Sequence, residues 1–171
     1  MQLNGYTLKA VKTMETMDGI AYSCNIYFGG KKIGMACNDG RGGMTDIHVM
    51  PGIPDRAALC AVLTEDFAER LFTLHGYEKA FKAHPAGKSM AFVSYSGPFD
   101  LEAYLCGQNI TAEALTAHIG KTKTGREIDS IEIFRSLDDF NIDESQQQEM
   151  ADNQQPGEGT EEGFGGMTMT M

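Results

Sequence analysis

Apolar and polar residues alternate along the first fifty residues, and this two-residue period predicts strands with one buried face. The alternation is clearest along Ile20–Phe28 and again along Ile33–Cys37. Gly29-Gly30 separates these two runs, and a glycine pair supplies the positive φ angles that a tight hairpin turn requires. With further strands over Leu3–Met14 and Thr45–Val49, we expect this part of the chain to form an antiparallel β-meander.

A three- and four-residue spacing of apolar side chains replaces the alternation after Pro51 and predicts one long helix over residues 54–76. The side chains expected to face the meander are Leu59, Val62, Leu63, Phe67, Leu71 and Leu74. Those expected to face water are Arg56, Glu65, Glu69 and Arg70. Burial of the apolar set is the predicted link between helix and meander.

Residues 77–137 show shorter patterns of both kinds and are expected to form a smaller mixed α/β segment. Strands are predicted over Ser89–Tyr95 and Ile128–Phe134, and helices over Phe99–Cys106 and Thr111–Ile119. Strands and helices fall in blocks instead of strict alternation, which favours the α+β class. The sequence thus predicts a globular body over residues 1–137.

The composition changes at residue 138, and residues 138–171 read as an acidic tail rich in Gln, Gly and Met. The formal net charge is −10, all 14 basic side chains lie at or before Arg135, and nine acidic ones follow it. The body is therefore nearly neutral and the tail carries the charge. Low hydrophobicity with charge of one sign predicts a segment that is flexible in isolation.

No motif in the chain predicts an enzyme, a metal site or a cofactor. Gly87-Lys88-Ser89 lacks the glycine that a phosphate loop needs five residues earlier, where Lys82 stands. His48 shares a strand face with Asp46, but two ligands do not make a zinc site. The four cysteines form no CxxC pair and are expected to be small buried side chains, with a Cys24–Cys37 bridge left open. Catalytic groups assembled only in space also remain open.

No apolar run reaches the ~20 residues of a membrane span, and the start of the sequence lacks the features of a secretory signal. We therefore expect a cytoplasmic protein.

The sequence NDGRGG, residues 38–43, is the strongest candidate for a binding loop. In one interpretation the loop holds Arg41 near Lys31 and Lys32 to contact a phosphate or carboxylate. In the other it is a well-formed connection between strands with an exposed arginine. Adding acids of the loop and tail, the predicted partner-binding residues are Lys31, Lys32, Asp39, Arg41, Asp138, Asp139, Asp143 and Glu144.

The segment YFGGKKIGMACNDGRGG, Tyr27–Gly43, resembles the opening of small proteins of phages and mobile elements. The short, acidic chain without enzyme motifs also resembles anti-CRISPR inhibitors of type II RNA-guided nucleases. The resemblance implies a non-enzymatic protein in a host bacterial cell that binds such a nuclease with its guide RNA. It would block DNA binding or cleavage, either by mimicry of DNA charge or by hindering a domain motion.

The alternative is a nucleic-acid-binding accessory protein of a phage or mobile element. Its predicted contacts are Lys31, Lys32, Arg41, Lys121, Lys123 and Arg126. Pairing with a second copy of the chain is left open.

Overall fold

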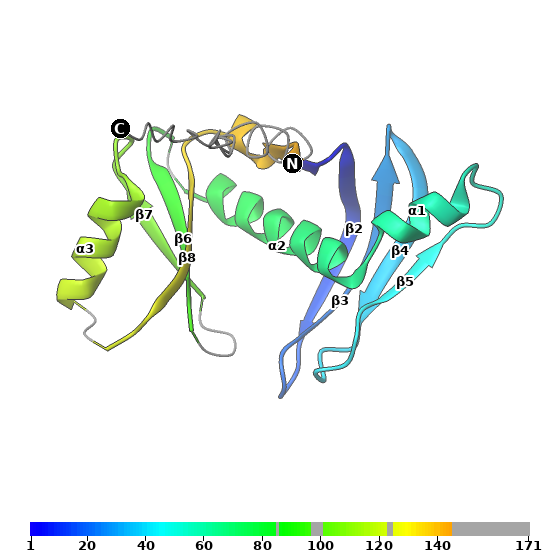
Figure 1. The fold of residues 1–171 in the computed structure, drawn as a ribbon, viewed down its shortest axis with the longest axis horizontal. Helices are drawn as coiled ribbons and strands as arrows, with labels where there is room; N and C mark the ends of the chain where they lie inside the picture. Colours follow the sequence, from blue (N-terminus) through cyan, green and yellow to red (C-terminus); the bar gives the residue numbers. More distant parts are fainter. Residues whose placement is uncertain (85, 97–100, 123–124, 145–171) are drawn as a thin grey trace, which may run out of the picture.

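The protein has an α+β fold in which one helix lies between two sheets. The computed structural model describes residues 1–84, 86–96, 101–122 and 125–144. Helix α2 (Glu65–Lys82) separates a six-stranded sheet from a three-stranded one (Figure 1). A single core cluster joins side chains from both sheets to α2, so the three layers are packed as one unit.

The larger sheet has the strand order β5-β4-β3-β2-β1-β9. Its strands are β1 (Gln2–Leu3), β2 (Tyr6–Glu15), β3 (Ile20–Phe28), β4 (Lys31–Asn38), β5 (Asp46–Val49) and β9 (Asn141–Ile142). Strands β1 to β5 pair antiparallel in sequence order, which confirms the predicted meander. Gly29 and Gly30 have φ angles of 54° and 79°, as the predicted hairpin turn requires.

The predicted single helix over residues 54–76 is wrong, because the chain forms two helices there. Helix α1 (Arg56–Val62) ends at Leu63, and α2 starts after Thr64, whose backbone is extended. The Thr64 hydroxyl accepts a hydrogen bond from the Phe67 amide at 3.3 Å and so caps α2. The new helix begins with Glu65 and Asp66, whose charges suit its N-terminus. These capping signals override the apolar spacing that runs through both helices.

Helix α2 is buried on two sides, so the expectation that Arg70 faces water is wrong, whereas Arg56 and Glu69 are exposed as predicted. The Phe72 ring stacks on Tyr22 of the larger sheet, with centroids 4.0 Å apart. The Tyr77 ring stacks on Phe92 of the smaller sheet at 3.7 Å. Arg70, predicted to face water, forms a two-pronged hydrogen-bonded ion pair across to β8, at 2.8 and 2.6 Å from the Glu132 carboxylate.

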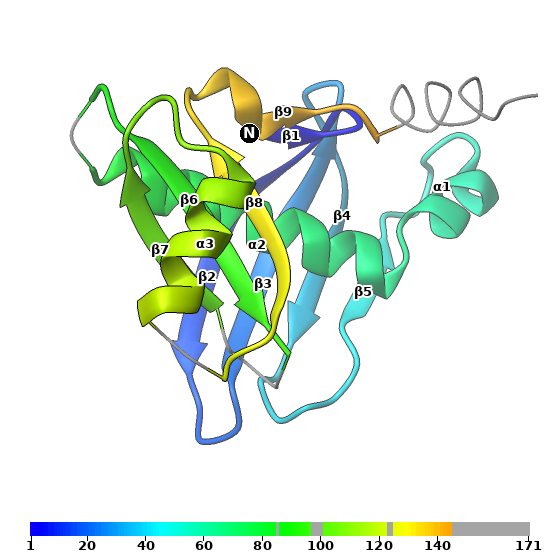
Figure 2. The ribbon, with the colours of Figure 1, turned by 60° about the vertical axis from the view of Figure 1, so that its left-hand side comes forward.

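The smaller sheet has the order β7-β6-β8 and carries helix α3 on the face away from α2 (Figure 2). Its elements are β6 (Ser89–Tyr95), β7 (Leu101–Cys106), β8 (Ile128–Phe134) and α3 (Ala112–Thr122). Both predicted strands and the helix predicted over Thr111–Ile119 are confirmed. The Thr111 hydroxyl accepts a hydrogen bond from the Ala114 amide at 3.2 Å and so caps α3. The helix predicted over Phe99–Cys106 is wrong, since residues 101–106 pair with β6 as a strand.

The folded body continues past the predicted boundary at residue 137. Asp138–Phe140 form a 3₁₀ turn, and β9 then pairs parallel with β1 at the edge of the larger sheet. Phe140 is 0% exposed and stacks on Phe134 with centroids 4.1 Å apart. The first residues assigned to the tail are therefore part of the folded body, and only the part of the predicted tail after Glu144 lies outside the described residues.

All four cysteines are free thiols, and only Cys24 is buried. The strand register places Cys24 opposite Ala36 and Cys37 opposite Ser23. Neighbouring positions on a strand point to opposite faces, so the bridge between Cys24 and Cys37 that the sequence left open is not formed.

Candidate interaction surface

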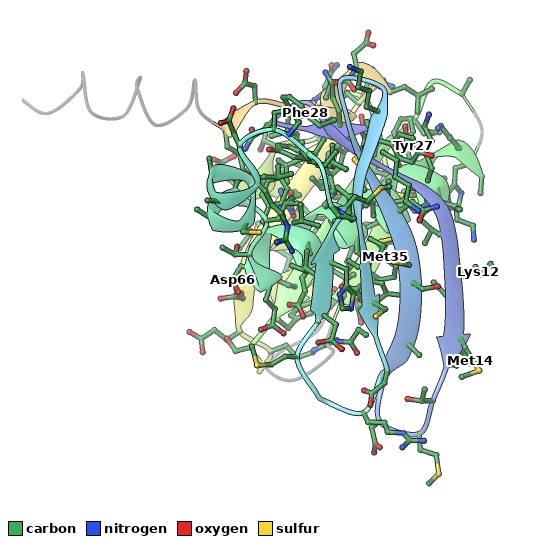
Figure 3. The ribbon with its side chains drawn as sticks, turned by 90° about the vertical axis from the view of Figure 1, so that its right-hand side faces the viewer. Lys12, Met14, Tyr27, Phe28, Met35 and Asp66 are labelled. Atoms are coloured by element: carbon green, nitrogen blue, oxygen red, sulfur yellow. The ribbon has the colours of Figure 1, made fainter. Side chains whose placement is uncertain are left out.

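One face of the larger sheet packs on α2, and no described helix covers the opposite face (Figure 3). The register assigns residues to this uncovered face. Lys9 pairs with Asn25, Asn25 with Met35, and Met35 with His48, across four adjacent strands. The intervening positions, such as Leu8 and Ala36, are buried against α2. We call this surface the open face; its members are Lys9, Lys12, Met14, Ser23, Asn25, Tyr27, Lys32, Met35, Cys37, Asp46 and His48.

The open face is positively charged in a protein of net negative charge. It presents the ammonium groups of Lys9, Lys12 and Lys32 against the single carboxylate of Asp46. The Lys9 Nζ lies 4.4 Å from the centroid of the Tyr27 ring, within the range of a cation–π contact. Among the described residues, none of these lysines forms an ion pair. The surface is therefore suited to a partner that carries negative charge.

Two exposed methionines lie on the open face. Met14 is 66% exposed and Met35 is 42% exposed, and both lie on the face seen in Figure 3. Other large apolar side chains of the same sheet and its loops are also exposed, namely Met17, Ile20, Phe28, Met44 and Met50. Methionine is flexible and polarisable, so an exposed group of methionines fits the contours of a binding partner well.

The predicted cluster of Arg41 with Lys31 and Lys32 is wrong. Lys31 and Lys32 begin β4, whereas Arg41 lies in the loop beyond its other end at Asn38. The strand between them is about 23 Å long at a rise of ~3.3 Å per residue. Lys32 belongs to the open face, and Lys31 is the first residue of β4, where it pairs with Phe28.

The NDGRGG loop has the geometry of a well-formed strand connection. The Asn38 Oδ1 accepts from the Gly40 amide at 2.7 Å, and the Asp39 Oδ1 accepts from the Arg41 amide at 3.0 Å. The Thr16 hydroxyl donates to the Gly40 carbonyl at 2.6 Å and joins this loop to the β2–β3 turn. Asp39 therefore stabilises its own loop, and Arg41 extends from it, exposed.

The four predicted acids after residue 137 lie at the end of the described body, on other elements than the predicted lysines and Arg41. The Asp139 carboxylate accepts from the backbone amides of Arg135 and Ser136 at 2.5 and 3.1 Å. Burial acts to raise the pKa of Asp139, but these hydrogen bonds outweigh it and the pKa is lowered. The Glu144 amide donates to the Asn4 Oδ1 at 2.8 Å, and its carboxylate lies 3.9 Å from Arg70.

Asp139 and Glu144 thus have structural contacts. Asp138 lies exposed in the 3₁₀ turn, and Asp143 follows β9.

A polar cluster that sequence reasoning missed lies in the smaller sheet. The Tyr95 hydroxyl is 2.8 Å from the Tyr104 hydroxyl and 3.2 Å from the Glu102 carboxylate. Arg126 donates to Glu102 at 2.7 Å and lies over the Tyr95 ring. Burial raises the pKa of Tyr95 and of Tyr104, so both phenols stay protonated at neutral pH and act as hydrogen-bonding groups. Strands β6 and β7 and the loop before β8 supply these residues, so no local sequence motif predicts the cluster.

The residues described in the structure contain no group of three or more His, Cys, Asp or Glu side chains placed to hold a metal ion. Asp46 and His48 share one strand face, as predicted. None of the described helices combines the length and apolar character that crossing a membrane requires.

Comparison with known proteins gives no match: no family model, no curated protein and no solved structure is similar to this chain. We therefore infer the function from the chain's own surfaces.

Proposed function

We propose that this protein is a non-enzymatic binding protein that contacts its partner through the open face. The observation that carries this proposal is a four-stranded sheet surface left uncovered, with three lysines and exposed methionines on it. Lysines around apolar contacts fit a protein surface with acidic residues around an apolar patch.

The partner class that we propose is a host RNA-guided nuclease of type II, with its guide RNA, as the resemblance of Tyr27–Gly43 implies. Part of that segment, β4 with Lys32 and Met35, lies on the open face. Because Asp139 is occupied by backbone amides, we assign the contact to the open face instead of the acids after residue 137. Binding there would block DNA binding or cleavage by hindering a domain of the nuclease.

The test is capture of a type II effector–guide complex, combined with a DNA-cleavage assay. We expect the wild-type protein to bind the complex and inhibit cleavage. The double variant Lys9→Glu/Lys12→Glu should lose both, since it reverses two charges on the open face. Lys121→Glu, which changes an exposed lysine of α3, is the matched control and should behave as wild type. Unimpeded cleavage at a large excess of the wild-type protein would refute the nuclease proposal.

A second candidate is nucleic-acid binding by the same face, favoured by the contact between Lys9 and Tyr27 beside Lys12 and Lys32. Lysines contact phosphates, and an aromatic ring on a sheet stacks on an unpaired base. The larger set predicted from the sequence does not form one patch. Lys121 and Arg126 belong to the smaller sheet's side, Arg126 is bound to Glu102, and Lys123 lies outside the described residues.

A gel shift with single-stranded DNA tests this candidate. Affinity should fall with added salt, and Lys12→Glu should weaken binding and reduce the salt dependence. Failure to bind at low salt would exclude it, whatever the result with the nuclease.

A further inference from the structure

The two sheets have four edge strands, and three of them are protected against pairing with another chain. Natural edge strands are protected by short length, charged side chains or a covering element. Strand β9 has two residues. Strand β5 has four and contacts α1. Strand β8 carries the exposed carboxylate of Asp129.

Strand β7 lacks these protections. It has six residues, and no other strand of the described chain pairs with its outer edge (Figure 2). Leu101 and Leu105 are each 48% exposed. Both leucines lie on the same sheet face as Ala103. Ala103 pairs with Phe92, which is buried against α2, so this is the face toward α2, and the two leucines are exposed on it. The only charged residue, Glu102, belongs to the opposite face and bonds to Tyr95 and Arg126.

We propose that β7 pairs antiparallel with β7 of a second copy of the chain, which joins two smaller sheets into one sheet of six strands. A two-fold axis perpendicular to such a sheet pairs one central residue with its own copy, and residues on either side pair in reciprocal fashion. The choice of central residue fixes every contact.

Complementarity selects Ala103 as the central residue. Leu101 of each copy then lies opposite Leu105 of the other, so four exposed leucines form one apolar row on the α2 side. On the other face Glu102 lies opposite Tyr104, the same pairing of carboxylate and phenol that occurs within one chain. A register centred on Glu102 would place two carboxylates opposite each other, which is unfavourable.

The contact between two six-residue strands is small beside the ~1,200–2,000 Å² of a stable interface. A cavity of about 230 Å³ lined by Leu105, Met90 and Leu137 adjoins the strand and offers further apolar area on the same side. We therefore expect a dimer that dissociates on dilution. The surface is distinct from the open face, so this inference and the proposed function fail or succeed separately.

Sedimentation analysis over a range of concentrations is the first test. The wild-type chain should approach twice the monomer mass as concentration rises. The variant Leu101→Lys/Leu105→Lys should stay at the monomer mass, with an unchanged circular dichroism spectrum. Met17→Lys/Met44→Lys, which adds two charges at exposed methionines of the larger sheet, is the matched control and should dimerise like wild type. A wild-type monomer at all concentrations, or a dimer that survives both lysines, would overturn the proposal.

Cross-linking gives a second test that does not depend on how the lysine variant folds. In a background with Cys37, Cys60 and Cys106 changed to Ser, Ala103→Cys should form a disulfide-linked dimer under mild oxidation, because directly opposed residues have Cβ atoms close to disulfide range. Asp129→Cys on β8 is the control and should not cross-link. Equal cross-linking of the two variants would contradict pairing through β7.

Discussion

Gly40 shows at the scale of one residue why the NDGRGG loop contains so much glycine. A Cβ at this position would lie 2.8 Å from the Ile20 carbonyl carbon and closer still to the Ala21 backbone nitrogen, far inside contact distance. Gly42, two residues later, has a similar φ of +77°, but a Cβ there would have no neighbouring atom within 4 Å. Comparing Gly40 with Gly42 therefore separates the cost of the left-handed backbone from the cost of a steric clash of the Cβ atom.

We expect Gly42→Ala to destabilise the protein by about 1 kcal/mol, the cost of a left-handed backbone for alanine. Gly40→Ala has this cost and the clash with Ala21, so its loss should be ~3 kcal/mol or more. Urea unfolding of both variants measures the difference. Equal losses would show that the loop does not pack on β3 as described.

His75 makes stability depend on pH. Burial lowers the pKa of His75 below its ordinary value of 6.5. At pH values just below 6.5, the folded chain therefore binds fewer protons at His75 than the unfolded chain does. The free energy of unfolding should fall on acidification through this pH range and rise again with pH. His75→Gln should flatten the slope, as measured by urea unfolding at a series of pH values. His84→Gln, at an exposed histidine, is the comparison variant and should leave the slope in place.

At the scale of elements, the break between α1 and α2 divides two neighbouring side chains that the sequence placed together in the core. Leu63 is buried, whereas Val62 is 44% exposed. Leu63→Ala should destabilise by ~2–5 kcal/mol through a core cavity, and Val62→Ala should cost less than about 1 kcal/mol. Chemical denaturation of the two variants checks the break directly, because a continuous helix with both residues buried would give two large losses.

Elements defined by local chemistry were predictable. The meander follows from alternation and from the Gly29-Gly30 turn, whose signals lie within a few residues. Residues 101–106 were misassigned because Leu101 and Leu105 fit the spacing of a helix as well as that of a strand. Only the pairing with β6 selects the strand over the helix, and this pairing is a tertiary contact that the local sequence does not show. The same holds for α2, whose second buried side exists because the smaller sheet covers it.

At the scale of the whole molecule, the open face shows why the candidate site was only partly predictable. Lys32 was among the predicted residues, but Lys9, Lys12 and Met35 were not, since β2 and β4 contribute them from separate parts of the chain. The prediction from the sequence grouped residues that are close along the chain. The strand register instead brings together residues from neighbouring strands, which are distant along the chain. Arg41 was grouped with Lys31 for that reason and lies beyond the far end of the strand.

The extent of the folded body can be tested by truncation. Removal of residues 138–171, the predicted tail, takes away Phe140 and β9, so it should lower stability by at least the ~3–5 kcal/mol typical of losing a buried phenylalanine. Removal of residues 145–171 leaves both in place and should cost much less. Thermal unfolding of the two truncated proteins gives the comparison, and equal melting temperatures would mean that β9 contributes little.

The parallel pair of β1 and β9 also bears on how the chain reaches this fold during synthesis. Gln2 leaves the ribosome well before its partner Asn141, because almost the whole described body lies between them in the sequence. Such a distant contact forms late, because the intervening chain must close first. Until then β1 has an unpaired edge, so a nascent chain stalled before residue 141 would expose a surface that chaperones or neighbouring chains bind.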